Sequence, residues 1–264
     1  MGTALITGAS SGIGAAFAEA LAQRGMNLVL VARSKERLQQ LADTLKAQHG
    51  IRADVIVQDL TKLDAAAIVF EAVKVLDVEI DLLINNAGFG DYGAFGDRPR
   101  QKQLDMIQLN IGALVDLTHH FLPQMQQRKS GSILNIASIA GFQPMPYLSI
   151  YAATKAFVLS FSEALWAENQ DKGVHVMAVC PGPTESSFFE AADFPKTLAS
   201  EGQSLVPAAV VVKEALLALE QKEPNVVTGG IGNQLVVNAS RFLPRPTLVN
   251  GIAKLFRPKA TSNS

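Results

Sequence analysis

The sequence predicts an α/β protein in which helices cover both faces of one parallel sheet. Short apolar runs alternate with longer helical patterns from the N-terminus onward. The apolar runs are rich in Val, Ile and Leu and alternate little with polar residues, which is typical of strands buried on both faces of a parallel sheet. Strict alternation of strand and helix implies right-handed crossovers, and therefore a doubly wound sheet.

The same patterns place the elements along the chain. The predicted strands are Thr3–Thr7, Asn27–Ala32, Asp54–Gln58, Leu82–Asn85, Gly131–Ala137 and Val174–Cys180. The predicted helices are Gly12–Gln23, Ser34–Gln48, Asp64–Leu76, Gln101–Gln127, Tyr151–Asn169 and Pro207–Glu220, the last with a proline suited to its first turn. No linker rich in Pro, Gly or Ser divides the chain, so residues 1–264 are expected to form one Rossmann-like domain.

Composition narrows the class of protein. Of the 264 residues, 48% are hydrophobic and 18% are charged, which is enough apolar material for a large core. The net charge of -1 gives no electrostatic reason to expect nucleic-acid binding, and the four histidines show no metal-ligand spacing. Cys180 is the only cysteine, so a reducing compartment is expected. Without a signal-peptide pattern or an apolar stretch of membrane-spanning length, we expect a cytoplasmic protein.

Two segments depart from the strand–helix rhythm. Gly182–Val206 is longer than most loops in compact domains, and we expect it to form a lid that buries Phe188, Phe189 and Phe194 over the substrate. The alternative is a static loop whose phenylalanines pack on the domain in every state. The second segment, about residues 224–264, contains no Asp or Glu and carries Arg241, Arg245, Lys254, Arg257 and Lys259. We expect no membrane partner, although a lipid-surface role for this basic segment stays open.

A glycine-rich loop follows the first predicted strand, with the sequence Thr7-Gly8-Ala9-Ser10-Ser11-Gly12-Ile13-Gly14. Glycine permits a tight turn and lets the backbone approach a pyrophosphate at the N-terminus of the next helix. The spacing G-x-x-x-G-x-G differs from the usual dinucleotide fingerprint, and such a cluster alone can be an ordinary turn. Its place between the first strand and the first helix favours a dinucleotide site.

The end of the second predicted strand indicates which dinucleotide is bound. An acidic residue there would hydrogen-bond the adenine ribose, whereas this chain has Ala32, Arg33 and Ser34, with Lys35 and Arg37 close behind. A guanidinium can bind a 2′-phosphate through two hydrogen bonds, so we predict NADP(H). The alternative is that Arg33 is a solvated surface residue and Ser34 caps the next helix.

Four motifs resemble the classical short-chain dehydrogenases/reductases in order and spacing: Thr7–Gly14, Asn85-Asn86-Ala87-Gly88, Tyr151-Ala-Ala-Thr-Lys155 and Pro181-Gly182. The resemblance runs from Thr3 to about Gly182. It implies an oxidoreductase that transfers a hydride between the nicotinamide and a small-molecule carbonyl or secondary alcohol. It also implies a homodimer or homotetramer built through the two long helices.

The expected catalytic residues are Asn110, Ser138, Tyr151 and Lys155. Tyr151 and Lys155 are four residues apart and share one helix face, and an ammonium together with a positive nicotinamide would lower the pKa of the phenol toward the range of a general acid–base. Ser138 ends the fifth strand, where its hydroxyl could polarise a substrate carbonyl. In the family, the residue matching Asn110 helps hold a water that links the lysine to solvent. The alternatives are that Tyr151 and Lys155 have this spacing by chance, that Ser138 caps the end of the strand, and that Asn110 is a buried amide that satisfies the backbone.

The resemblance also implies contacts around the cofactor, with Asp59 beside the adenine, Lys155 on the nicotinamide ribose and Thr184 at the carboxamide. The full predicted cofactor set is Gly8, Ser10, Ser11, Gly12, Ile13, Gly14, Arg33, Ser34, Asp59, Leu60, Asn86, Ala87, Gly88, Tyr151, Lys155, Pro181, Gly182 and Thr184. Several aromatic residues in the loops at this sheet edge mildly favour an apolar substrate. The competing function is a non-catalytic NADP(H)-binding protein on the same fold.

Overall fold

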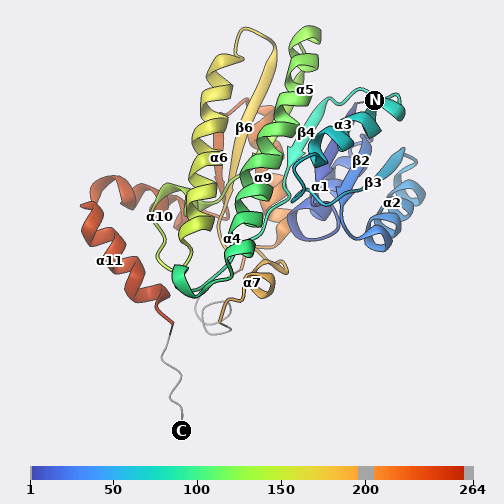
Figure 1. The fold of residues 1–264 in the computed structure, drawn as a ribbon. Helices are drawn as coiled ribbons and strands as arrows, with labels where there is room; N and C mark the ends of the chain where they lie inside the picture. The colour runs from blue at the N-terminus through green and yellow to red at the C-terminus, as the bar shows by residue number, and fades with distance from the viewer. Residues whose placement is uncertain (1, 196–204, 259–264) are drawn as a thin grey trace.

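Seven parallel strands form one sheet in the computed structural model, which describes residues 2–195 and 205–258. Their order across the sheet is β3-β2-β1-β4-β5-β6-β7. The bounds are β1 Thr3–Thr7, β2 Asn27–Ala32, β3 Ala53–Val57, β4 Leu82–Asn85, β5 Gly131–Ile136, β6 Val174–Pro181 and β7 Asn225–Thr228. Every neighbouring pair is parallel, so the predicted doubly wound α/β fold is confirmed (Figure 1).

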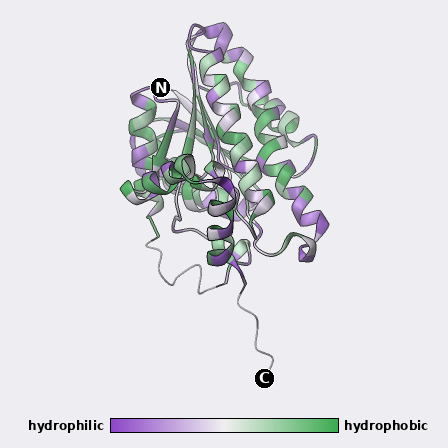
Figure 2. Ribbon diagram, turned by 90° about the vertical axis from the view of Figure 1, so that its left-hand side faces the viewer, coloured by the Kyte–Doolittle hydropathy of each residue, from purple (hydrophilic) through white to green (hydrophobic). Residues whose placement is uncertain are grey.

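Successive residues of the strands enter two different core layers. Ile6 and Leu28 pack under α1 (Gly12–Gln23), α2 (Lys35–His49) and α9 (Ala208–Glu220). Leu5 and Val29 pack on the other face, against α3 (Ala65–Val75) and α5 (Leu114–Arg128). Burying each such side chain stabilises the fold by about 1.5–3 kcal/mol. Because both faces are covered, the strands need apolar residues at every position, and Figure 2 shows helices on either side of the sheet.

The helix predicted at Gln101–Gln127 is not regular throughout. It consists of α4 (Arg100–Ile107), a π-helical turn (Gln108–Ala113) and α5. The prediction of one continuous α-helix is therefore wrong at its centre, because a π turn accommodates an extra residue and offsets the helix on either side. Asn110 lies in this turn, 1% exposed.

The C-terminal segment, predicted only as a basic stretch, contains regular structure. β7 extends the sheet beyond β6, α10 spans Ile231–Phe242 and α11 spans Arg245–Phe256. Gly229 and Gly230, with φ of 90° and 91°, allow the sharp turn from β7 into α10. Across the described residues, no helix combines the length and apolar character needed to cross a membrane.

The sheet order reverses between β1 and β4, which are neighbours although they are not consecutive in sequence. The two crossovers leave these strands toward opposite sides, which opens a crevice at their carboxyl ends. Thr7 Oγ1 accepts hydrogen bonds from the backbone N–H groups of Asn86 (2.9 Å) and Ala87 (3.0 Å), which ties the end of β1 to the loop after β4. α6 (Ser149–Glu168) and the short α7 (Phe188–Ala191) complete the walls of this crevice.

Candidate active site

A cleft of about 980 Å³ follows the carboxyl ends of the strands. This volume lies at the upper end of the range for ligand and cofactor sites. The sheet order places three regions along it. Arg33 and Asp59 lie beyond β2 and β3, the glycine loop lies beyond β1, and Tyr151 lies on α6 beside β5.

The glycine loop has the backbone that a pyrophosphate site needs. Gly8 and Gly12 have φ of 66° and 56°, and a Cβ atom at Gly8 would lie 3.0 Å from the Ala87 Cα. The Ser11 side chain makes no capping hydrogen bond to α1, so the N–H groups of the first turn are not capped by it. A helix N-terminus of this kind binds anions through its backbone and its dipole. The loop therefore fits a dinucleotide.

Gly14 has a packing role in the structure, and its predicted cofactor contact stays a prediction. It does not line the cleft, and a Cβ atom there would lie 2.4 Å from the Gly8 carbonyl oxygen and 2.6 Å from the Asn86 Nδ2. Its missing side chain allows α1 to pack directly against the loop and does not provide a ligand contact. All the other predicted cofactor residues line the cleft.

The cleft beyond β2 carries two exposed guanidinium groups, those of Arg33 and Arg37. The Asp59 carboxylate accepts hydrogen bonds from the backbone N–H (3.1 Å) and hydroxyl (2.9 Å) of Thr61. Burial opposes ionisation of Asp59, but these hydrogen bonds and the positive charges of Arg33 and Lys62 outweigh it and lower its pKa. Asp59 is thus both a turn residue and part of the cleft wall.

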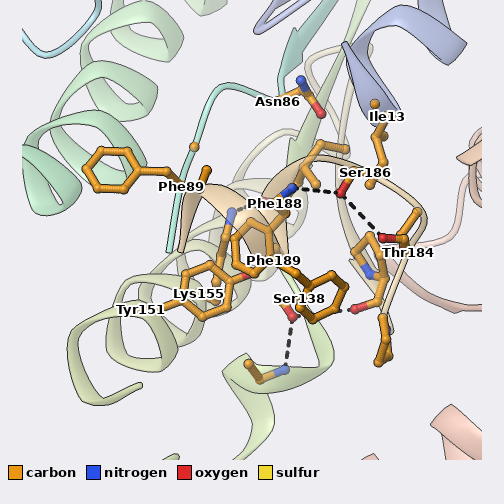
Figure 3. A pocket seen from close by; sticks show the side chains of 18 of the residues that line it. Ile13, Asn86, Phe89, Ser138, Tyr151, Lys155, Thr184, Ser186, Phe188 and Phe189 are labelled. Atoms are coloured by element: carbon orange, nitrogen blue, oxygen red, sulfur yellow. Dashed lines mark hydrogen bonds between the residues drawn. The ribbon is translucent and has the colours of Figure 1, made fainter. Parts of the chain in front are cut away.

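Ser138, Tyr151 and Lys155 meet at the other end of the cleft (Figure 3). The Ser138 hydroxyl accepts a hydrogen bond from the Ala140 N–H at 3.1 Å and donates one to the Pro181 carbonyl at 3.4 Å. It lies close enough to the Tyr151 hydroxyl to favour the phenolate. Lys155 Nζ donates to the Ile136 carbonyl at 2.6 Å and lies 5.8 Å from the centre of the Tyr151 ring. The shared helix face predicted from the four-residue spacing therefore points into the cleft.

Burial dominates the acidity of both titratable groups. It raises the pKa of Tyr151 to about 12, against the lowering effect of the bond to Ser138. It lowers the pKa of Lys155 to about 8. Without the nicotinamide, desolvation outweighs the nearby ammonium, which bonds to Ile136. A lowered phenol pKa in the complex with the oxidised cofactor stays a prediction. At neutral pH, the phenol holds its proton.

Asn110 does not line the cleft. Its Oδ1 accepts from the Phe89 N–H (3.1 Å), and its Nδ2 donates to the Phe89 carbonyl (3.0 Å) and to Thr154 Oγ1 (3.0 Å). The side chain thus joins the loop after β4 to α6, as the buried-amide alternative describes. A Cβ atom at Gly88 would lie 3.0 Å from Asn110 Oδ1 and 3.6 Å from Lys155 Nζ, so Gly88 lets both approach.

Aromatic rings cover the end of the cleft that holds Tyr151. The rings of Tyr151 and Phe188 lie 5.1 Å apart, and Phe189 and Phe194 pack next to Phe188. A Cβ atom at Gly90 would lie 2.5 Å from Phe188 Cζ, so any side chain there would displace this ring. Phe89 and Met145 also line the cleft, whereas Phe95 is 64% exposed and lies outside it. Part of the predicted lid, residues 196–204, lies outside the described residues.

Sequence analysis missed a whole wall of the cleft. Residues of α10 and α11 line it, among them Val236, Leu248, Ile252 and Phe256. The spacing of Leu248, Ile252 and Phe256 at every fourth position was a usable signal of a helix with one apolar face. The Tyr92 hydroxyl donates a hydrogen bond of 2.7 Å to the Phe256 carbonyl and fixes the end of α11 over the cleft.

Comparison with known proteins gives a consistent match. A family model described as short chain dehydrogenase matches residues 2–196. A very-long-chain 3-oxoacyl-CoA reductase of Anas platyrhynchos is 41% identical over 186 residues, which cover 67% of this chain and 58% of the relative. A 17-beta-hydroxysteroid dehydrogenase type 3 of Rattus norvegicus is 38% identical over 181 residues, with the same two coverages. The chain thus matches less than two thirds of the length of these relatives.

Solved structures are similar over the whole chain. A short-chain dehydrogenase from Sphingobium yanoikuyae in complex with NADPH has a TM-score of 0.82 and 34% identity, and the match covers 100% of this chain and 98% of that one. A bulky-bulky ketone specific alcohol dehydrogenase from Comamonas testosteroni has a TM-score of 0.78 and 33% identity, and the match covers 100% and 97%. Both matches include α10 and α11.

Proposed function

This chain belongs to the short-chain dehydrogenase family, and on that premise we propose that it is an NADP(H)-dependent oxidoreductase for ketones or secondary alcohols with bulky apolar substituents. The observation that carries the proposal is the meeting of Ser138, Tyr151 and Lys155 at one end of a cleft whose middle is a glycine loop. A protein that only bound the dinucleotide would have no use for a phenol, a hydroxyl and an ammonium at that place.

The cofactor preference is supported by charge. Arg33 and Arg37 line the cleft where the adenine ribose would lie, and residues 32–34 include no carboxylate. Two guanidinium groups favour a 2′-phosphate over a free hydroxyl. The similar structure from Sphingobium yanoikuyae holds NADPH, which agrees with this choice. When bound, the nicotinamide supplies or accepts the hydride.

The chain's own residues then manage the substrate oxygen and the proton. Ser138 donates a hydrogen bond that polarises a carbonyl, and Tyr151 gives its proton to the oxygen as negative charge develops there. With a pKa of about 12, the phenol keeps its proton at neutral pH but is a stronger acid than an alcohol. Lys155 lies next to the ring and stabilises the phenolate that remains.

The substrate class is supported by the lining. Phe188, Phe189 and Phe194 cover one side of the reacting end, and the apolar residues of α10 and α11 form a second wall of the same cleft. The relatives are named for long-chain oxoacyl, hydroxysteroid and bulky-bulky ketone substrates, all of which carry large apolar groups. We therefore place a large apolar ketone between the two walls.

The experiment is a panel of ketones of increasing size, assayed with NADPH and with NADH by loss of cofactor absorbance. Tyr151→Phe should reduce turnover by about a hundredfold or more while cofactor binding survives. Tyr147→Phe is the matched control, because Tyr147 packs near Tyr92 but does not line the cleft. Turnover of Tyr151→Phe near that of Tyr147→Phe would overturn the proposal and favour a protein that binds NADP(H) without catalysis.

A further inference from the structure

α10 presents an apolar face to solvent. Ile231, Leu235 and Phe242 are 76%, 66% and 84% exposed. At about 100° of rotation per residue, these three lie within about 40° of one another on the helix. Val237, which is buried, lies on the opposite side. α10 therefore carries apolar side chains both where it packs on the protein and where it faces outward, beside the exposed Gln234 and Asn238.

The exposed surface continues past the end of the helix. Leu243 follows Phe242 and is 46% exposed, and we call Ile231, Leu235, Phe242 and Leu243 the C-terminal apolar patch. Val236 and Leu255 are also exposed and line the cleft, so the cleft opens beside this patch. α10 and α11 stand at the left of Figure 1, on the side that faces the viewer in Figure 2.

The C-terminal segment carries charge of one sign. From Pro224 onward the sequence contains no Asp or Glu. Arg245, Lys254 and Arg257 are exposed, and among the described residues none of them has an ion-pair partner. A partner for this face must therefore accept apolar side chains and carry negative charge.

We propose that the C-terminal apolar patch docks on an anionic lipid surface and holds the cleft mouth at the membrane. Apolar side chains next to exposed cations are the features of helices that lie in the membrane interface. A second copy of this chain fits less well, because a symmetric contact would bring the same cations together. An apolar ketone dissolved in the lipid would then enter the cleft between α10 and α11, a step that rests on the proposed function.

The test is co-sedimentation of the full chain with vesicles of phosphatidylcholine alone or with about a third phosphatidylglycerol. The expected result is binding to the anionic vesicles that weakens as salt is raised. L235E/F242E should bind about tenfold less. The matched control is L63E/V75E, since Leu63 and Val75 are 83% and 86% exposed but lie just before α3 and at its last residue. Neutralising the cations in R245Q/K254Q/R257Q should remove the preference for anionic lipid.

Several outcomes would overturn the docking proposal. These are absence of binding by the unmodified chain, full binding by L235E/F242E, or equal losses in L63E/V75E. A dimer that L235E/F242E dissociates, without vesicle binding, would identify the patch as a contact between copies. Turnover of a water-soluble ketone without vesicles should be the same in L235E/F242E, because neither side chain lines the cleft. Failure of lipid docking is therefore distinguishable from failure of the proposed function.

Discussion

Lys155 is 6% exposed, and its ammonium bonds to the neutral carbonyl of Ile136. Burial destabilises the charged form, and no ion pair to Lys155 is present among the described residues to offset it, so its pKa falls to about 8. A neutral side chain of similar length would fill the same space without this cost. At the residue scale, the Lys155 ammonium is therefore useful for the proposed chemistry but lowers the stability of the folded protein.

This conflict predicts that Lys155→Met stabilises the protein without cofactor while abolishing ketone reduction. Removing the desolvated ammonium should raise the free energy of unfolding at pH 7 by about 2 kcal/mol, after loss of one hydrogen bond. The unfolded lysine titrates near 10.5, so the wild-type penalty is complete below pH 8 and disappears as the pH rises to about 10.5. Urea denaturation at pH 7 and pH 10 measures it. If Lys155→Met changed the free energy of unfolding equally at pH 7 and pH 10, desolvation of the ammonium would not be the cause.

A second residue-scale prediction concerns Arg33. Replacing it with Asp adds repulsion toward a 2′-phosphate, so Arg33→Asp should raise the KM for NADPH at least about tenfold and leave that for NADH little changed. Steady-state kinetics with both cofactors measures the shift. Arg24→Asp, an exposed arginine on the far end of α1, is the control. Unmodified protein that used NADH as well as NADPH would contradict the preference.

At the residue scale, the sequence could predict which residues share the site better than it could predict their pKa values. The four-residue spacing correctly placed Tyr151 and Lys155 on one face, because helix geometry is local. It could not predict the direction of the phenol pKa, because that depends on how α6 is buried. Asn110 was interpreted through its family counterpart, whereas its contacts with Phe89 and Thr154 arise from the π turn, which no local pattern revealed.

At the scale of elements, a charge network joins the loop after β4 to α7. The Asp91 carboxylate is fully buried and bonds to Arg98 and Lys102, and both cations also contact Asp193 just after α7. Burial opposes the ionisation of Asp91, but these partners outweigh it and lower its pKa. The network therefore holds α7, and with it Phe188, over Tyr151.

Asp193→Ala should loosen α7 without unfolding the protein. Asp193 is 56% exposed, so its ion pairs contribute less than about 1 kcal/mol to stability, and global unfolding should change little. Amide exchange over residues 188–194 should become faster in the free protein, and the difference should shrink when NADPH and substrate are bound. Glu190→Ala, one exposed carboxylate on the same helix, is the control. Unchanged exchange would mean that the aromatic rings alone hold α7, as in the static-loop alternative.

The sequence predicts strands most accurately where both faces of the sheet are covered by helices. The six predicted strands agree with the structure to within one residue at each end, because strands covered on both faces read as continuous apolar runs. β7 was missed because it is a four-residue edge strand with only two apolar positions, Val226 and Val227. α10 was missed because its exposed side mixes apolar residues such as Ile231 and Leu235 with polar ones such as Gln234 and Asn238, so a polar outer face does not stand out in the sequence.

At the scale of the whole molecule, exposed apolar side chains on α4 and α6 bear on assembly. Leu104 and Ile107 on α4 are 40% and 38% exposed, and Phe157 on α6 is 40% exposed and stacked on Phe161. These helices match the ones through which the family resemblance implies a homodimer or homotetramer. The assembly state stays a prediction.

L104E/F157E should convert such an oligomer into a monomer, because two charges in an apolar interface cannot be desolvated cheaply. Light scattering after size-exclusion chromatography measures the molar mass, with L63E/V75E again as the control. A monomeric unmodified chain, or an L104E/F157E oligomer of unchanged mass, would contradict an interface through these helices.

The bond between Tyr92 and Phe256 spans 164 positions of the chain and has a consequence for how the protein is made. A ribosome releases the sheet from one end, so β1 to β6 and the glycine loop can assemble while α11 is still being synthesised. We therefore expect the part of the cleft formed by β1 to β6 to be in place before α11 is released to close it. The order of synthesis would then set an order of maturation, with the α11 wall added last.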